Sequence, residues 1–257
     1  MASESLSGEK GDIPVIILCG GKGLRLRPMT QETPKPLLQI GQRTIVEHVM
    51  ANFRSGGFSN FNLCVGYLSE KFEDHFSTSD LPSAGGSTGS LYSEQTQSVE
   101  LIDSGVGTGL ADRISVTLDQ TNHSRAIVTY GDTLADVDVD ALFEFHKSHD
   151  SNVTITGVNA RCRYGVLRRD GESVTQFDEK PMLSERINGG FFVLDKAAFS
   201  HFDSDDGLVE TINRISDQGE LQMFEHDGYF DSVDTHKDLQ RVREITEGRT
   251  SLPWMHD

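Results

Sequence analysis

The sequence predicts a single α/β domain built on a mixed, mostly parallel β-sheet with helices on its faces. Short runs rich in Val, Ile and Phe alternate with segments of helical spacing, and this strand–helix–strand rhythm is typical of parallel sheets. A length of 257 residues suits one large domain or two small ones, and no internal repeat is visible. We therefore expect a flexible leader at residues 1–12 and one domain over residues 13–257.

The first half of the chain is predicted to supply four strands and three helices. The strands are apolar runs bounded by glycine or polar residues, and the helices show apolar residues three and four apart. The expected ranges are Val15–Cys19, Phe61–Val65, Val99–Asp103 and Arg125–Tyr130 for the strands, and Ile45–Arg54, Ser69–Phe76 and Val139–His149 for the helices. Gly56-Gly57 would end the first of these helices, and Asp138 would cap the last. Ser77–Ser98, rich in Ser, Thr and Gly, is expected to be a mobile loop or a segment ordered by a neighbouring subunit.

The second half of the chain is predicted to be richer in hairpins. Its expected strands are Val153–Val158, Val166–Arg168, Val174–Phe177, Gly190–Leu194 and Leu221–Glu225, and its helices are Lys196–Phe202, Gly207–Gln218 and His236–Gly248. The turn Arg169-Asp170-Gly171 joins two of these strands, because glycine after Asp is typical of tight hairpin turns.

Charge and composition exclude several classes of partner. A formal net charge of −17 argues against nucleic acid or an anionic membrane surface. The longest apolar runs are of strand length, too short to cross a bilayer, and the polar N-terminus lacks the pattern of a signal peptide. Three cysteines without a Cys-x-x-Cys pair favour free thiols in a reducing compartment, so we expect a cytoplasmic protein.

A glycine-rich segment, Leu18–Pro28, follows the first predicted strand. Gly20, Gly21 and Gly23 would let the backbone turn tightly and point its N–H groups at a phosphate. The spacing differs from Gly-x-Gly-x-x-Gly, and no Ser or Thr follows the Gly-Lys pair as in a Walker loop. We interpret the segment as a phosphate loop with its own arginine, Arg25; the alternative is a plain glycine turn.

Cations gather in the same stretch of this acidic chain. They are Lys22, Arg25, Arg27, Lys35 and Arg43, opposed only by Glu32. Lys35 stands between Pro34 and Pro36, whose rings restrict the backbone on both sides, so its ammonium can be aimed at one place. We predict an anion site here; the alternative is a solvated basic turn.

These motifs resemble the sugar-1-phosphate nucleotidyltransferase family. The resemblance rests on Gly20-Gly21-Lys22-Gly23-Leu24-Arg25-Leu26-Arg27-Pro28 followed by Pro34-Lys35-Pro36. Further runs are similar to the glucose-1-phosphate cytidylyltransferase branch, namely Gly66-Tyr67, Asp103-Ser104-Gly105, Tyr130-Gly131-Asp132, Glu179-Lys180-Pro181, Ile187–Val193, Val233-Asp234-Thr235 and Pro253-Trp254. The resemblance implies a Rossmann-like sheet of the nucleotide-diphospho-sugar transferase type, with a nucleotide half near residues 13–135 and an acceptor half near residues 136–257.

The resemblance also implies a role for each matching residue. Arg25 and Lys35 would be the catalytic cations. The nucleotide would be bound by Leu18, Gly20, Gly21, Lys22, Gly23, Thr108, Arg113 and Gly131. The sugar phosphate would meet Glu179, Lys180, Asn188 and Gly189, and Mg²⁺ would be held by Asp132 and Asp234. The implied substrates are a nucleoside triphosphate, CTP being favoured, and a sugar 1-phosphate such as glucose 1-phosphate; a homo-oligomer is expected.

This chain departs from the family pattern at two places in the predicted site, and the Ser-rich loop from Ser77 also differs from the usual sequence of the branch. Leu24 stands where the family usually has Thr, which removes a hydroxyl but spares the phosphate-facing backbone. Between Gly105 and Arg113 the branch normally has more glycine and a methionine, which weakens the assignment of the base more than that of the chemistry.

The implied chemistry agrees with the residue types. A phosphate oxygen is already ionised near neutral pH, so the reaction requires no general base and depends on positioning and on neutralising charge. Carboxylates suit Mg²⁺, although from the sequence alone Asp132 and Asp234 could also be turn residues. His146 and His149 lack a third metal ligand, and the run Asp203, Asp205, Asp206 lacks the spacing of a calcium loop, so we predict surface roles for both.

Two alternatives stay open from the sequence. One is the same reaction with another base, or with a different sugar phosphate, a non-sugar phosphate or a phosphonate as acceptor. The other is a catalytically silent, nucleotide-sugar-binding subunit that regulates an active partner.

Overall fold

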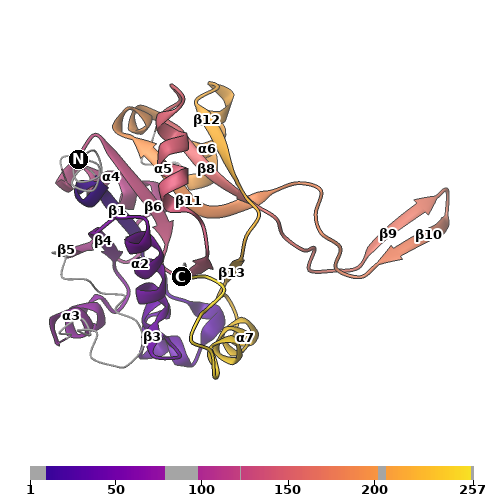
Figure 1. The fold of residues 1–257 in the computed structure, drawn as a ribbon, viewed down its shortest axis with the longest axis horizontal. Helices are drawn as coiled ribbons and strands as arrows, with labels where there is room; N and C mark the ends of the chain where they lie inside the picture. The colour runs from indigo at the N-terminus through magenta and orange to yellow at the C-terminus, as the bar shows by residue number, and fades with distance from the viewer. Residues whose placement is uncertain (1–9, 79–97, 122, 202–206, 256–257) are drawn as a thin grey trace.

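A computed structural model describes residues 10–78, 98–121, 123–201 and 207–255 (Figure 1). Its centre is a seven-stranded sheet in the order β12-β8-β11-β6-β1-β4-β5. The strands are β1 Pro14–Leu18, β4 Asn60–Val65, β5 Ser98–Asp103, β6 Arg125–Tyr130, β8 Val153–Val158, β11 Ile187–Asp195 and β12 Leu221–His226. Only β11 runs antiparallel to its neighbours in this sheet, which confirms the predicted mixed, mostly parallel arrangement.

Helices pack on both faces of this sheet. They are α2 Ile45–Ser55, α3 Ser69–Thr78, α4 Leu110–Thr121, α5 Val139–Lys147, α6 Leu208–Asp217 and α7 His236–Thr246, with 3₁₀ turns η1 Leu24–Leu26, η2 Met29–Gln31, η3 Lys35–Leu37 and η4 Lys196–His201. Because side chains alternate along a strand, β1 sends Val15 and Ile17 into the core under α2 and α5. Ile16 and Leu18 enter the opposite core, under α4 and α6.

A third cluster ties the C-terminal segment to the glycine-rich loop. Trp254 is 1% exposed and packs with Leu26 of η1, Leu38 after η3, and Leu239 of α7. Short strand pairs complete this region: β2 Gln39–Ile40 with β3 Arg43–Thr44, and β7 Thr133–Ala135 with β13 Phe230–Ser232. The segment that contains Trp254 therefore packs against the glycine-rich loop region.

A two-stranded ribbon, β9 Val166–Asp170 with β10 Ser173–Asp178, projects far from the sheet (Figure 1). We call residues 161–182 the arm. The pairing places Leu167 opposite Phe177, and a bulge brings Val174 to the same face, opposite Arg169. The three apolar side chains on this face are 59–61% exposed. The arm therefore presents an apolar face to solvent.

Most predicted elements are confirmed to within two or three residues, but the structure also contains elements that were not predicted, among them the short strands β2, β3, β7 and β13. Helix α4, Leu110–Thr121, was not predicted, although Ile114 and Leu118 bury one of its faces, because the preceding glycines suggest a loop. The helix expected at Lys196–Phe202 is a 3₁₀ segment, Lys196–His201. The division into nucleotide and acceptor halves stays a prediction.

Some expectations fall on residues outside the described ranges. These are residues 1–9 of the leader, most of the loop Ser77–Ser98 and the acidic run at residues 203–206. Residues 10–12 are helical and pair with the body, where the Lys10 ammonium meets Asp140. In the described part of the chain, no helix has the length and hydropathy needed to cross a bilayer.

Stability should fall in mild acid because of His48. This side chain is 3% exposed, its Nε2–H donates to the Ile40 carbonyl at 3.0 Å, and its ring meets Trp254 edge-on at 5.6 Å. Burial lowers the pKa of His48 from 6.5 to about 4. A depressed histidine pKa contributes stability above 6.5 that is lost as the pH falls toward 4, here about 2–3 kcal/mol by pH 4.5.

Denaturant unfolding of the wild type and His48→Gln at pH 7 and pH 4.5 would test this. Glutamine keeps an N–H donor but cannot titrate, so the wild type should lose more stability over this range than the variant. His236→Gln, an exposed histidine on α7, is the control and should behave as the wild type. Equal losses in the wild type and His48→Gln would contradict the assignment.

Candidate active site

A cavity of about 660 Å³ opens where β1 and β6 end. Its walls contain most of the residues that the sequence predicts for a nucleotide site. These are Leu18, Gly20, Gly21, Lys22, Gly23, Arg25, Lys35, Thr108, Arg113, Asp132 and Asp234. The carboxyl ends of parallel strands are where ligands bind on open α/β sheets, so the location agrees with the expectation.

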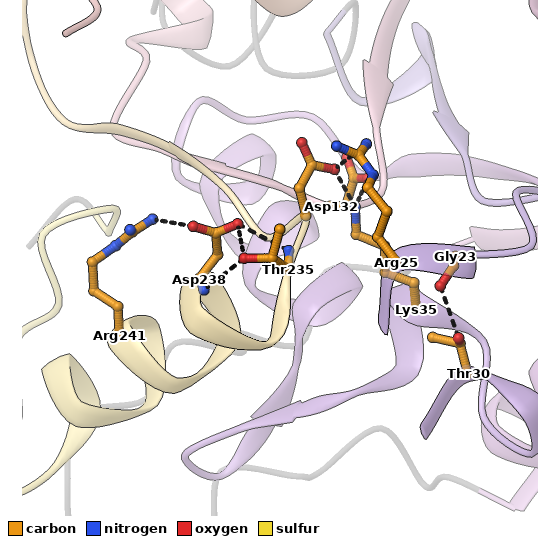
Figure 2. Close-up of polar contacts among 9 residues, drawn as sticks. Gly23, Arg25, Thr30, Lys35, Asp132, Thr235, Asp238 and Arg241 are labelled. Atoms are coloured by element: carbon orange, nitrogen blue, oxygen red, sulfur yellow. Dashed lines mark hydrogen bonds and ion pairs between the residues drawn. The ribbon is translucent and has the colours of Figure 1, made fainter. Parts of the chain in front are cut away.

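The glycine-rich loop is shaped around Lys35. Gly23 has a φ of +56°, a left-handed conformation that favours glycine, and its carbonyl accepts a hydrogen bond from Thr30 Oγ1 at 2.8 Å (Figure 2). A Cβ on Gly23 would stand 3.3 Å from the Cβ of Lys35. Pro34 and Pro36 set the backbone of the η3 turn that begins at Lys35. The two predicted motifs thus form one packed unit.

Asp132 and Asp234, far apart in the sequence, are brought together by a backbone pairing. β7 follows Asp132 and β13 precedes Asp234, and these strands pair with Thr133 opposite Ser232. The Val233 N–H then donates to the Asp132 carbonyl at 3.1 Å. The two carboxylates are therefore held side by side by main-chain hydrogen bonds.

Two cations converge on these carboxylates (Figure 2). The Lys35 ammonium lies 2.5 Å from an Asp132 oxygen and 2.9 Å from an Asp234 oxygen. The Arg25 guanidinium lies 3.0 Å from the same Asp234 oxygen. The Lys35 side chain is 11% exposed and that of Arg25 is 65% exposed, so lysine is the inner cation of the pair. We call Arg25, Lys35, Asp132 and Asp234 the ion cluster.

The cluster also sets the acidity of Asp234. Partial burial raises its pKa, but hydrogen bonding and the charge of Lys35, with the charge of Arg25, more than offset this, so the pKa lies below 3.8. Arg163 on the arm also lowers this pKa. Asp234 is thus an anion throughout the neutral range.

Arg113 shapes the cavity mainly by holding a neighbouring loop through hydrogen bonds. Its Nε donates to Thr108 O at 3.1 Å, Nη1 to Val65 O at 3.1 Å and to Ser104 Oγ at 2.7 Å, and Nη2 to Gly105 O at 2.8 Å. These bonds fix the loop that forms one wall of the cavity. The side chain is 5% exposed, because most of its donors face protein.

Several predicted site residues do not line the cavity. Gly131 packs behind its wall, where a Cβ would stand 2.8 Å from the sulfur of Cys19. Asn188 reaches it indirectly, through a hydrogen bond with Tyr130, and Gly189 follows Asn188 in β11. Glu179 and Lys180 are exposed on the arm. The structure thus places the predicted nucleotide residues at the cavity and the predicted sugar-phosphate residues outside its lining.

Several residues that build the site were not among the predicted site residues, although Cys19, Leu24, Pro36 and Tyr130 lie in motifs recognised in the sequence. Cys19, Leu24, Pro36, Val106, Gly107, Leu110 and Tyr130 complete the cavity wall. Thr235 and Asp238 form a capping box at the start of α7, directly after Asp234, and Arg241 pairs with Asp238 at 3.2 Å (Figure 2). The spacing Thr-x-x-Asp could have predicted that cap. No sequence pattern of this kind predicts the apolar residues of the cavity wall.

The histidines at positions 146 and 149 have a structural role. Each lies within hydrogen-bond distance of Thr154 Oγ1, His146 at 2.8 Å and His149 at 3.0 Å, and His146 Nε2 lies 3.4 Å from Asp195. Among the described residues, no group of three or more His, Cys, Asp or Glu side chains could hold a metal ion alone. His146 is buried in this network, which corrects the predicted surface position.

Fold and site together define an α/β protein with a glycine-lined cavity and an ion cluster at the carboxyl edge of an open sheet. Residues 14–247 match the model of the nucleotidyl transferase family. The chain therefore belongs to that family of enzymes. It is 30% identical to the glucose-1-phosphate cytidylyltransferase of Salmonella typhi, over 93% of this chain and 97% of the relative. It is 28% identical to a mannose-1-phosphate guanyltransferase of Kluyveromyces lactis, over 87% of this chain and 62% of that relative.

Solved structures confirm the fold. HddC from Yersinia pseudotuberculosis superposes with a TM-score of 0.65 at 22% sequence identity, over 90% of this chain and 98% of that chain. The predicted Rossmann-like sheet and the predicted family are both confirmed.

Adding a methyl group at Gly20 should loosen the cavity wall, whereas Gly21 should tolerate it. A Cβ at Gly20 would stand 2.0 Å from Arg113 Nη1, while a Cβ at Gly21 meets nothing within 4 Å. We expect Gly20→Ala to cost about 1–3 kcal/mol and to lower the unfolding midpoint by several degrees. Calorimetry without nucleotide measures this, with Gly21→Ala as the matched control. Equal midpoints for the two variants would contradict the packing described for Arg113.

Proposed function

We propose that this enzyme transfers a nucleotidyl group from a nucleoside triphosphate to a sugar 1-phosphate, releasing pyrophosphate. Family membership supports the reaction, and the ion cluster beside a glycine loop is the observation that carries the proposal. CTP and glucose 1-phosphate are the substrates we favour, since the Salmonella typhi relative, at 30% identity, is named for both. Another base remains the alternative, because a guanyltransferase matches at 28% identity.

In this proposal the protein works by positioning and charge. The nucleophile is a phosphate oxygen that is already ionised, so no residue has to remove a proton. The main-chain N–H groups of the glycine loop hold the triphosphate, Arg25 meets its outer phosphates, and Lys35 meets the phosphates that react. Both side chains line the cavity, and Lys35 is positioned by its flanking prolines. Preorganised cations of this kind stabilise charge that develops in a transition state.

The residues of the site suit a magnesium ion. The Lys35 ammonium already bridges one oxygen of Asp132 and one of Asp234, so a place between these two carboxylates accepts a positive charge. Mg²⁺ in phosphoryl-transfer sites takes one or two carboxylates and completes its shell with phosphate and water. When bound, the ion would neutralise phosphate charge and orient the triphosphate. Asp132 and Asp234 would hold it.

Pyrophosphate release tests the reaction. Each common triphosphate is paired with several sugar 1-phosphates, and CTP with glucose 1-phosphate is expected to give the highest kcat/KM. If another pair gives the highest kcat/KM, the assigned base or acceptor changes, but the reaction class stands. No release with any pair would favour the alternative of a silent regulatory subunit.

Removing one charge of the ion cluster should abolish most turnover without unfolding the protein. We expect Lys35→Ala and Asp132→Asn each to lower kcat about 10²-fold or more, because preorganised charge supplies much of the rate in such reactions. Lys147→Ala, which removes an exposed ion pair with Glu144 on α5, is the control and should keep wild-type turnover. Near-normal activity in folded Lys35→Ala or Asp132→Asn would remove these residues from the mechanism.

We also propose that the chain forms a homo-oligomer in which the arms of two copies meet through their apolar faces. An isolated two-stranded ribbon is marginally stable in water, so exposed Leu167, Val174 and Phe177 favour a partner that covers them. The arm carries five Lys or Arg and four Asp or Glu residues, whereas the whole chain carries a net charge of −17. Contact through projecting, nearly neutral arms would keep the acidic bodies apart, and one self-complementary face suits a two-fold axis.

Neighbouring residues on opposite faces of β10 provide the test. Phe177→Lys places a charge on the apolar face and should yield a smaller species in sedimentation velocity. Gln176→Lys places the same charge on the opposite face, beside Asp178, and should keep the wild-type assembly. A monomeric wild type at micromolar concentration, or an unchanged Phe177→Lys, would contradict the arm interface.

A cytoplasmic location stays part of the proposal. All three cysteines are free, and Cys19 and Cys64 are buried, which suits a reducing compartment.

A further inference from the structure

The ion cluster holds its charges in internal balance. Two cations, Arg25 and Lys35, face two anions, Asp132 and Asp234, within 3.0 Å. The ammonium of Lys35 therefore already has two strong acceptors. In this arrangement two of the three ammonium N–H groups of Lys35, and one oxygen of each carboxylate, are already engaged.

The proposed function requires the two cations and the two carboxylates to contact other partners. A triphosphate needs Lys35 and Arg25 as counter-ions, and a divalent ion needs the carboxylate oxygens. Mg²⁺ binds oxygen at about 2.0–2.1 Å with strict geometry. The lysine Nζ lies only 2.5 and 2.9 Å from those two oxygens, so ion and ammonium would occupy overlapping space and repel each other.

We infer that the divalent ion and the Lys35 ammonium bind the Asp132–Asp234 pair in alternation. Entry of the ion displaces the lysine, which then becomes free to meet phosphate. This inference rests on the proposed function, because that function supplies the ion.

The fold determines which partner moves. The β7–β13 pairing and the Val233 N–H bond to the Asp132 carbonyl fix the backbones of Asp132 and Asp234, and these short side chains have only two rotatable bonds each. Lys35 has a fixed backbone but a four-carbon side chain with rotatable bonds, and it lines the cavity. Exchange therefore requires only a change of lysine rotamer.

The alternation couples the ion and the nucleotide. By thermodynamic linkage, whatever draws the lysine away from the carboxylates strengthens binding of the ion, and the ion strengthens binding of phosphate to the lysine. Without nucleotide the ion must compete with the ammonium and binds weakly. The cluster thus disfavours the state in which the metal site is empty and Lys35 has no counter-ion.

Mn²⁺ binding without nucleotide tests the inference apart from activity. The full chain is titrated with Mn²⁺, and free ion is measured by electron paramagnetic resonance. Lys35→Met removes the ammonium but keeps the length of the side chain, and should bind Mn²⁺ about tenfold or more tightly than the wild type, a typical coupling. Lys22→Met is the matched control, because Lys22 is an exposed cation of the same cavity outside the ion cluster.

The outcomes separate the inference from the proposed function. Tighter Mn²⁺ binding in Lys35→Met but not in Lys22→Met supports the exchange. Equal tightening in both variants, or none in Lys35→Met, overturns it while leaving the metal site intact. Absence of Mn²⁺ binding in all three proteins, even with nucleotide, overturns both the metal site and the exchange.

A measurement on the wild type covers the case in which Lys35→Met does not fold. In ¹⁵N-labelled protein, the Lys35 ammonium resonance, assigned through Lys35→Arg, should be protected while the carboxylates hold it. Adding Mg²⁺ alone should shift or broaden this resonance but leave that of Lys147 unchanged. A Lys35 signal unaffected by saturating Mg²⁺ would overturn the inference.

Discussion

Two carboxylates fixed side by side are the constraint on which the site depends. The β7–β13 pairing and the Val233 N–H bond place Asp132 next to Asp234 whether or not a cation is present. Like charges this close are unfavourable without a counter-ion. Lys35 supplies that counter-ion inside the cavity, and Arg25 adds a second at its exposed rim. Because the backbone places two carboxylates side by side, positive charge nearby is needed to stabilise them. Side chains of the protein, a bound ion or both can supply that charge.

The rest of the fold keeps this arrangement rigid and accessible. Cores on both faces of the sheet bury β1, so the carboxyl edge is the part of the strand left for a ligand. The third core, with Trp254 at 1% exposure, packs the C-terminal segment against the loop that carries Arg25. Arg113 fixes the opposite wall through the loop carbonyls that it binds. Packing thus positions each side of the cavity independently of any ligand.

Local signals in the sequence predicted the sheet, most helix limits and the glycine-rich loop with Lys35, whereas the family resemblance supplied Thr108, Arg113, Asp132 and Asp234. The glycines after β1 and the prolines around Lys35 act within a few residues, so their effects can be inferred from spacing. The contact between Asp132 and Asp234 depends on pairing between two three-residue strands, and so short a pairing leaves no recognisable pattern. The role of Arg113 as the support of a loop was also hidden, because a buried arginine and a ligand-binding arginine look alike in sequence. Glu179 and Lys180 were assigned by resemblance, and their place on the arm depends on tertiary structure alone.

An acidic protein can hold a polyanion because electrostatic attraction is local. The net charge of −17 is that of the whole chain, and charges farther apart than about 8–10 Å are largely screened at physiological salt. The charged residues that line the cavity are those of the ion cluster, Lys22 and Arg113. The two carboxylates balance two of these cations, so in the proposed exchange the cavity attracts phosphate more strongly once the carboxylates take a divalent ion. In that exchange, the occupancy of one carboxylate pair sets how strongly the site attracts phosphate, and the distant charges of the chain contribute little.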